Sequence, residues 1–185
     1  MALKATGIVR RIDELGRVVI PKEIRRTLRI REGDPLEIFT DRDGEVILKK
    51  YSPIGELSAF AKEYTESLFR ALGHISLICD KDQIVSCSGV NRKEMQDKSI
   101  SQEIEQVLAS RQSYVYNKGQ GRACPIILDE EDVTYTAQVI TPILVEGESV
   151  GAVLLLSRED ATRMGETEIK VAETAAGFIG RQMEA

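Results

Sequence analysis

The sequence predicts an α+β protein with a small β-rich N-terminal domain and a larger domain in which helices flank a β-sheet. Three observations support this: β-branched runs alternate with turn residues before residue 50, amphipathic helical patterns begin near residues 53 and 166, and strand-like apolar runs lie between them. The expected parts are a first domain over residues 1–52, a linking helix over 53–73 and a second domain over 74–185.

The N-terminal domain is expected to fold in the order strand, strand, helix, strand, strand. Gly16 supplies a turn between the first two strands, and Pro21 suits the first position of the helix. Such a small unit buries too little surface to be stable alone, so we expect two copies to associate. The expected elements are strands at 7–13 and 17–20, a helix from Pro21 to near Ile30, and a hairpin over 36–40 and 45–49.

The second domain begins after a helical pattern that ends at Gly73, and this linking helix either packs on its own domain or pairs with a partner helix. Ala152–Leu156 is expected to be a buried central strand. The remaining expected elements are hairpins over 75–79 with 83–88 and over 134–145 with 149–157, a helical turn at 94–98, a strand at 113–116, and helices at 101–110 and 166–183.

The charge is divided unevenly along the chain, although the net charge is −5. Residues 1–31 hold nine Lys or Arg against three Asp or Glu, a balance of +6, whereas residues 53–185 hold 13 against 21, a balance of −8. A basic block on an acidic remainder is compatible with a nucleic-acid partner. No apolar run is long enough to span a membrane, so we expect a cytoplasmic protein without a membrane partner.

The three cysteines are expected to be reduced, structural thiols. They are odd in number, they lack CxxC spacing, and the chain has a single histidine, His74, so the sequence predicts neither a metal site nor a cofactor. No catalytic residues are predicted, and the chain is not expected to be an enzyme. The cysteines are Cys79, Cys87 and Cys124.

A short helical pattern in the first domain carries a basic face. Four cations recur at i, i+3, i+4 and i+7, whereas Ile24 and Leu28 point the opposite way. Like charges at this spacing repel one another, which favours a polyanion partner over a merely solvated face. The alternative is that the cations pair with Asp13, Glu14 and Glu23. The four cations are Lys22, Arg25, Arg26 and Arg29.

The segment Thr6–Pro21, which includes the sequence LGRVVIP, and its continuation through Leu28 resemble the AbrB family of transition-state regulators. The resemblance covers residues 5–51 and implies a swapped-hairpin dimer that binds double-stranded DNA through arginines. Arginine suits this role because its fork binds phosphate or the O6 and N7 atoms of guanine. The implied contacts are Arg10, Arg17, Arg25 and Arg26, with Arg11 and Lys22 as phosphate neighbours; Arg29 rests on the helical spacing alone.

Over nearly its full length the chain is similar to a family of sporulation regulators in which an AbrB-type domain precedes a GAF-type domain. This resemblance implies a tetramer whose second interface uses the helices at 53–72 and 166–183, and a pocket for an unidentified small ligand. Asn117-Lys118 and Asp129-Glu130 match parts of a cyclic-nucleotide motif, but Pro125 stands where that motif has phenylalanine, so the match is taken as coincidental. The Gly119–Gly121 loop is expected to be flexible, with an anion nest as the alternative.

Two other functions are compatible with parts of the sequence. Some GAF proteins reduce free methionine sulfoxide with cysteines, but Cys79 and Cys87 lie in strand-like apolar runs, where cysteine normally serves as a small hydrophobe. Antitoxins share folds related to the swapped hairpin and repress their own genes. They usually end in a disordered toxin-binding tail, whereas this chain continues as a folded domain.

Overall fold

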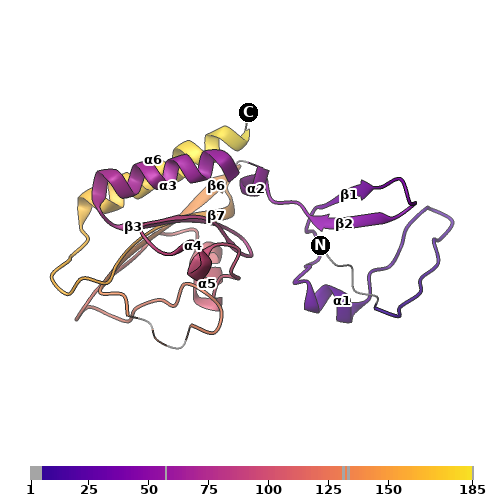
Figure 1. Ribbon diagram of the computed structural model, residues 1–185, viewed down its shortest axis with the longest axis horizontal. Helices are drawn as coiled ribbons and strands as arrows, with labels where there is room; N and C mark the ends of the chain where they lie inside the picture. The colour runs from indigo at the N-terminus through magenta and orange to yellow at the C-terminus, as the bar shows by residue number, and fades with distance from the viewer. Residues whose placement is uncertain (1–5, 57, 131, 133, 185) are drawn as a thin grey trace. The chain divides into compact units, whose positions relative to one another are not determined.

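The computed structural model describes residues 6–184 except 57, 131 and 133. It divides into two compact units, Met1–Tyr51 and Ser52–Ala185, which we call the N-terminal and C-terminal units (Figure 1). Each unit is described by itself below.

The N-terminal unit contains one short helix and one hairpin. Helix α1 spans Lys22–Thr27, and the antiparallel strands β1 (Leu36–Thr40) and β2 (Val46–Lys50) pair with Leu36 opposite Lys50. The predicted hairpin is therefore confirmed. The predicted turn is also present, with Gly16 at a φ of +77°, a conformation that glycine adopts without steric cost.

The two strands predicted at 7–13 and 17–20 were wrong for the single chain. Within the part of the chain that the structure describes, neither run pairs as a strand, apart from the hydrogen bond from the Asp13 N–H to the Arg17 carbonyl at 3.0 Å. A strand needs a neighbour for its backbone groups and a layer to cover its apolar face. The described residues of this chain supply neither here, since Val9 is 85% exposed and Val19 is 70% exposed.

Helix α1 ends three residues earlier than predicted. The Ile30 N–H donates to the Arg25 carbonyl at 2.7 Å and the Arg29 N–H to the Arg26 carbonyl at 3.3 Å, which together form a Schellman motif. Arg29 occupies the left-handed position of this motif with a φ of +52°. Its side chain therefore leaves the helical spacing that placed it beside Lys22 and Arg26.

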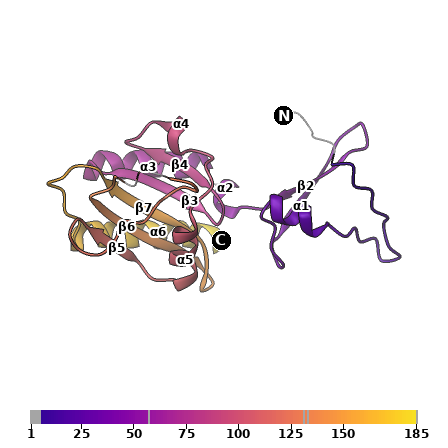
Figure 2. The same ribbon diagram turned by 90° about the horizontal axis from the view of Figure 1, so that it is seen from below.

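A five-stranded antiparallel sheet forms the centre of the C-terminal unit, with strand order β4-β3-β7-β6-β5 (Figure 2). Strand β7 occupies the middle, and its residues 151–157 are all buried, which confirms the predicted central strand. The strands are β3 (Ile75–Asp80), β4 (Ile84–Ser88), β5 (Tyr114–Asn117), β6 (Ala137–Val145) and β7 (Glu148–Ser157).

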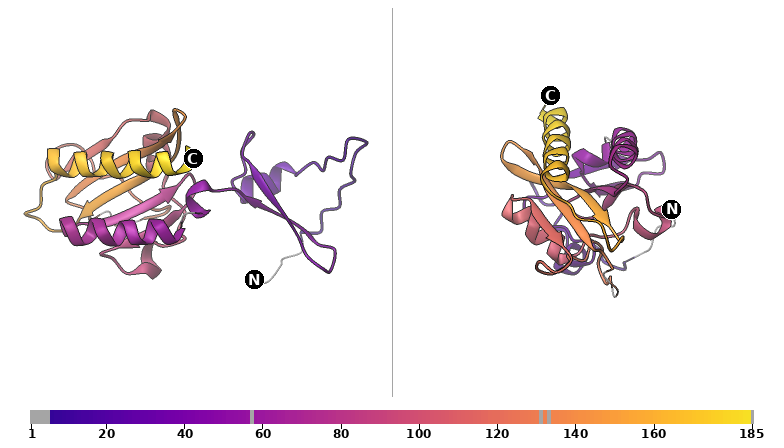
Figure 3. Two further views of the ribbon diagram at one scale, coloured as in Figure 1. Left: turned by 90° about the horizontal axis from the view of Figure 1, so that it is seen from above. Right: turned by 90° about the vertical axis from the view of Figure 1, so that its left-hand side faces the viewer.

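The helices cover the two faces of this sheet, and α3 lies beside α6 on one of them (Figure 3). Alternate strand residues separate two cores: Ile78, Val139 and Leu155 pack with α3 and α6, whereas Leu77 and Leu154 pack with α5. The helix after residue 53 thus packs on the sheet of its own unit. The helices are α2 (Pro53–Glu56), α3 (Ser58–Leu72), α4 (Arg92–Met95), α5 (Gln102–Ser110) and α6 (Glu166–Glu184).

The helical turn predicted at 94–98 lies instead at Arg92–Met95. Asn91 fixes its start, because the Asn91 side chain accepts a hydrogen bond from the Lys93 N–H at 3.1 Å. The last residue of β5, Asn117, is anchored to the segment that precedes α6. Asn117 is buried, and its amide group exchanges two hydrogen bonds with the backbone of Met164 at 2.8 and 2.9 Å.

None of the helices among the described residues combines the length and apolar character required to cross a bilayer.

Candidate nucleic-acid interface

The turn at residues 13–17 is organised by one carboxylate. The Asp13 side chain accepts hydrogen bonds from the backbone N–H of Leu15 at 3.0 Å and of Arg17 at 2.8 Å, and from the Arg17 Nε at 2.8 Å. The Arg17 backbone and side-chain donors hold the pKa of Asp13 below its usual range. The turn therefore presents Arg17, whose side chain is 71% exposed, in a fixed backbone conformation.

Among the predicted DNA contacts, Arg17 thus forms an ion pair with an acidic residue of its own chain, whereas the others do not within the part that the structure describes. Within the described part of the chain, no acidic side chain lies within 4 Å of the cationic groups of five of them. Four are exposed and one, Arg25, is half-buried. The five are Arg10 and Arg11 on the extended N-terminal segment, and Lys22, Arg25 and Arg26 on α1.

The cations on α1 share one helix only six residues long. Lys22 and Arg26 are four residues apart and Arg25 lies between them, so the structure brings these three together on adjacent turns. The charged side chains of these three residues provide the positive potential at α1. Arg29 is separated from this group by the Schellman turn and is half-buried.

Asp34 fixes the chain where it leaves α1 and enters the hairpin. Its carboxylate accepts a hydrogen bond from the Arg31 N–H at 2.8 Å and forms an ion pair with the Lys50 Nζ at 3.1 Å. Lys50 also donates to the Arg29 carbonyl at 2.9 Å. Partial burial raises the pKa of Asp34, but the Arg31 and Lys50 contacts outweigh burial and leave this pKa lowered.

Most large apolar side chains of the N-terminal unit are uncovered in the single chain. Helix α1 has no buried residue, and both faces of the hairpin are exposed. Among the described residues, the longer C-terminal unit exposes five large apolar side chains, against thirteen in the N-terminal unit. These thirteen are Ile8, Val9, Ile12, Leu15, Val18, Val19, Leu28, Ile38, Phe39, Val46, Ile47, Leu48 and Tyr51.

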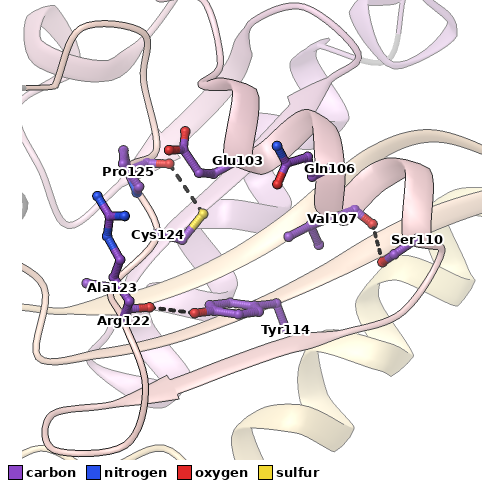
Figure 4. Close-up of a pocket in the computed structure, with 9 residues that line it drawn as sticks. All are labelled: Glu103, Gln106, Val107, Ser110, Tyr114, Arg122, Ala123, Cys124 and Pro125. Carbon is purple, nitrogen blue, oxygen red and sulfur yellow. Dashed lines mark hydrogen bonds between the residues drawn. The ribbon is translucent and has the colours of Figure 1, made fainter.

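The C-terminal unit has a separate cavity of about 330 Å³ beside α5 (Figure 4). One wall is helix α5, and the other is the segment before residue 126. Gln138 holds that segment, since its side chain exchanges two hydrogen bonds of 2.7 Å with the Cys124 backbone. The lining residues are Glu103, Gln106, Val107, Ser110, Tyr114, Arg122, Ala123, Cys124 and Pro125.

All three cysteines are free and buried, as predicted. Burial, reinforced by nearby carboxylates, raises the pKa of Cys79 and of Cys124 to about 12, and burial also raises the pKa of Cys87. A thiol with so high a pKa supplies little thiolate near neutral pH, so these side chains are poor nucleophiles. Among the described residues, no group of three or more His, Cys, Asp or Glu side chains could hold a metal ion.

Two residues of the partial cyclic-nucleotide motif form hydrogen bonds within the C-terminal unit. Asn117 binds the Met164 backbone, as described above, and Glu130 accepts hydrogen bonds from the Ile126 N–H at 2.6 Å and the Tyr135 hydroxyl at 3.0 Å. These hydrogen bonds connect segments of the C-terminal unit to one another.

Comparison with known proteins identifies the family. Residues 56–184 match the family model described as "Stage V sporulation protein T C-terminal, transcription factor". The chain is 56% identical over 182 residues to stage V sporulation protein T of Bacillus subtilis (strain 168), covering 98% of this chain and 99% of that protein. The chain belongs to the stage V sporulation protein T family.

Two further matches concern the N-terminal part of the chain. Residues 9–56 match the model described as "Antidote-toxin recognition MazE, bacterial antitoxin". Transition state regulatory protein AbrB of B. subtilis (strain 168) is 66% identical over 53 residues, which cover 29% of this chain and 54% of AbrB. The predicted AbrB-type N-terminal domain is confirmed.

The C-terminal unit has the GAF fold. It resembles the crystal structure of the GAF domain of an Acinetobacter phosphoenolpyruvate-protein phosphotransferase, with a TM-score of 0.58 and 11% identity, covering 73% of this chain and 84% of that one. The likeness at this level of identity concerns the fold alone, and it confirms the predicted GAF-type domain.

Proposed function

We propose that this protein regulates transcription of sporulation genes by binding specific sites on double-stranded DNA through its N-terminal unit. The observation that carries the proposal is the set of cations around α1 and the preceding segment that have no acidic partner among the described residues. Arg25 and Arg26 belong to this set, and Arg17 is presented by the Asp13 turn. The match to sporulation and transition-state regulators supports the same function. The proposed place of action is the cytoplasm, at the nucleoid.

Dimerisation through the N-terminal unit is part of the proposal. The uncovered apolar side chains of this unit need a second layer, and a second copy would supply both that layer and strand partners for residues 7–20. A two-fold dimer would also present the α1 cations twice, as two half-sites on DNA require.

A tetramer follows if α3 and α6 form a second interface. Phe60, Tyr64 and Phe178 form an aromatic cluster across these two helices, with ring centroids 5.5 to 6.0 Å apart. Phe178 is 44% exposed, so the cluster continues to the surface. An exposed aromatic group on paired helices is a suitable centre for an interface between copies.

The cavity beside α5 is proposed as the site of a small ligand. Its lining combines apolar groups, such as Val107 and Pro125, with the charged groups Glu103 and Arg122. Such a mixture suits a small molecule with both polar and apolar parts. No cofactor is needed for this function.

The double substitution Arg25→Ala with Arg26→Ala tests the DNA-binding surface. We expect at least a tenfold loss of affinity for DNA selected in vitro by the full-length wild-type chain. The dependence of log affinity on log salt should become shallower by about one for each phosphate contact removed. Fluorescence anisotropy at several salt concentrations measures both quantities.

Arg42→Ala is the matched control, because Arg42 is an exposed arginine of the same unit in the turn between β1 and β2. It changes the net charge by one without touching α1. Equal effects of Arg42→Ala and the double substitution, or no effect of either, would contradict the proposed surface.

An antitoxin that represses its own genes is the second candidate, favoured by the match of residues 9–56 to the antitoxin model. Here a folded GAF-type unit follows that segment in place of a disordered tail. A toxin partner would copurify with the chain at fixed stoichiometry, whereas the proposed regulator needs only DNA and its own copies.

A further inference from the structure

The N-terminal unit contains two turns of the same design, at residues 13–17 and 41–45. Each begins at an aspartate and has a glycine three residues later, and the two glycines have φ angles of +77° and +83°. In each turn the aspartate N–H donates to the carbonyl of the fourth following residue. This bond is 3.0 Å long between Asp13 and Arg17 and 3.2 Å long between Asp41 and Glu45.

One carboxylate oxygen closes each of these turns. The Oδ1 atom accepts the N–H groups of the second and fourth following residues, at 3.0 and 2.8 Å for Asp13 and at 3.0 and 2.9 Å for Asp41. Bonds from an aspartate side chain to the backbone that follows it are a common way to stabilise a turn. The backbone of both turns is therefore held in the same manner.

The second carboxylate oxygen distinguishes the two turns. Asp13 Oδ2 accepts the Nε–H of Arg17 at 2.8 Å, whereas Asp41 Oδ2 has no hydrogen-bond partner among the described residues. The turn at 41–45 thus forms without such a contact. The side-chain pair of Asp13 and Arg17 is therefore an addition to the turn and is not needed to build it.

This contact leaves one edge of the Arg17 guanidinium available to a partner. Of the five N–H donors of a guanidinium, Asp13 takes the one on Nε. The donors on the two terminal nitrogens have no acceptor within the described part of the chain, and the side chain is 71% exposed. Two parallel donors of this kind match either two phosphate oxygens or the O6 and N7 atoms of guanine.

The Asp13 carboxylate favours guanine over phosphate at this edge. A phosphate bound by the terminal nitrogens of Arg17 would lie close to the carboxylate, and like charges repel at this range, whereas the edge of a guanine has no net charge. The ion pair also cancels most of the attraction that Arg17 would exert on DNA phosphate at longer range. Holding Nε in place further reduces the conformational entropy that Arg17 loses on binding.

We propose that Asp13 is a specificity-determining residue, which orients Arg17 so that its terminal nitrogens bind a guanine in the major groove of DNA. This role rests on the proposed DNA-binding function. The cations of the unit that have no acidic neighbour among the described residues supply the charge that attracts phosphate, and Arg17 adds discrimination between base sequences.

Arg17→Lys distinguishes the two modes of binding, because lysine keeps the charge and binds phosphate but lacks the planar pair of donors. Fluorescence anisotropy of the full-length chain compares DNA selected in vitro by the wild type with a random sequence of the same length. We expect Arg17→Lys to lose about tenfold in affinity for the selected DNA and to keep its affinity for the random sequence.

A base analogue locates the contact. Guanines of the selected DNA are replaced one at a time by 7-deazaguanine, which lacks the N7 acceptor. At one or more positions this replacement should weaken binding by the wild type but should not weaken binding by Arg17→Lys.

Asp13→Asn tests the positioning role. Asparagine keeps an oxygen for the two backbone N–H groups but no longer offers a second, charged acceptor to Nε, so the turn remains and Arg17 is released. We expect the ratio of selected to random affinity to fall about tenfold. The log–log salt dependence on random DNA should steepen by about one for each protomer, since Arg17 then binds phosphate.

Asp41→Asn is the matched control, because it makes the same chemical change in the other turn and alters the net charge equally. It should leave the affinity ratio and the 7-deazaguanine effect unchanged. Equal effects of Asp13→Asn and Asp41→Asn on the ratio would overturn the proposal. A loss with Arg17→Lys that is equal for both DNAs, no loss for either, or no guanine whose effect depends on residue 17 would also overturn it.

Two features keep these outcomes separate from other failures. Arg17→Lys leaves the bonds between Asp13 and the backbone in place, so it decides the question if Asp13→Asn does not fold. The double substitution at Arg25 and Arg26 tests DNA binding without changing this turn. A positive result there with a negative result here would contradict the role of Asp13 alone.

Discussion

At residue scale, Asp34 decides how the N-terminal unit continues after α1. One carboxylate joins the Arg31 backbone to Lys50 at the end of the hairpin, and Lys50 in turn holds the Arg29 carbonyl. The position of α1 relative to β2 thus depends on one ionised group. Because α1 carries three of the proposed DNA contacts, the Asp34 carboxylate helps to position these contacts although it is not one of them.

We predict that Asp34→Asn destabilises the N-terminal unit in a pH-dependent manner. The folded-state pKa of Asp34 is lowered, so its carboxylate stabilises the fold above the unfolded pKa of about 3.9 and loses this effect as pH falls through the folded pKa. At pH 7 the variant should be less stable by about 1 kcal/mol. The difference should shrink between pH 5 and pH 3.

Amide exchange of β1 and β2 in the full-length chain measures this difference. Asp43→Asn, at an exposed acid in the turn between the same strands, is the matched control and should show a smaller effect at pH 7. A constant difference between wild type and Asp34→Asn across pH 3 to 7 would show that the carboxylate charge is irrelevant.

The sequence allowed part of this site to be predicted. Helical spacing correctly grouped Lys22, Arg25 and Arg26, because all three lie inside the six-residue helix α1. Their spacing therefore follows helix geometry even though the helix ends earlier than predicted. It failed for Arg29, because a Schellman turn formed at an arginine instead of a glycine. The role of Asp13 in the turn has a signal in the sequence, because Asp followed three residues later by Gly is a recognisable turn pattern.

At element scale, α6 shows how closely a helix can approach this sheet. A Cβ atom at Gly180 would lie 2.4 Å from the Leu144 carbonyl oxygen of β6, whereas a Cβ atom at Gly177 of the same helix would have no neighbour within 4 Å. The absence of a side chain at residue 180 therefore permits α6 to pack on β6.

We predict opposite effects for alanine at these two positions. Gly180→Ala should destabilise the C-terminal unit by about 1 to 3 kcal/mol, because rigid backbone occupies the space that the new methyl group needs. Gly177→Ala should stabilise it by up to about 1 kcal/mol through helix propensity. Urea unfolding of the full-length variants measures both changes, and equal signs would contradict the close approach.

Elements were predictable where their partners lie in the same chain. The strands of the C-terminal unit matched their predicted positions because each apolar run pairs with another run and is covered by a helix. Residues 7–13 have a similar β-rich composition but no such partners among the residues that the structure describes. Composition indicates that a segment favours a strand, and pairing decides whether it becomes one.

At the scale of the whole molecule, the exposed aromatic ring of Phe178 tests the proposed second interface. We predict that Phe178→Asp converts a tetramer into a dimer, because a carboxylate would be desolvated at the centre of the α3 and α6 contact. Size-exclusion chromatography with light scattering gives the mass directly.

Phe69→Asp is the control for this substitution. Phe69 also lies on α3 and is 38% exposed, close to the 44% of Phe178, but it packs beside Gly89 and does not belong to the aromatic cluster. A tetramer that survives Phe178→Asp, or dissociates equally with Phe69→Asp, would show that the aromatic cluster is not the interface.

The uncovered apolar side chains of the N-terminal unit have a consequence for how the regulator responds to its own abundance. If a second copy covers them as proposed, the competent DNA-binding dimer would accumulate with the square of protomer concentration when copies are scarce. Modest changes in synthesis or degradation would then produce disproportionate changes in promoter occupancy. Stochastic differences in copy number between sister cells would be amplified in the same way.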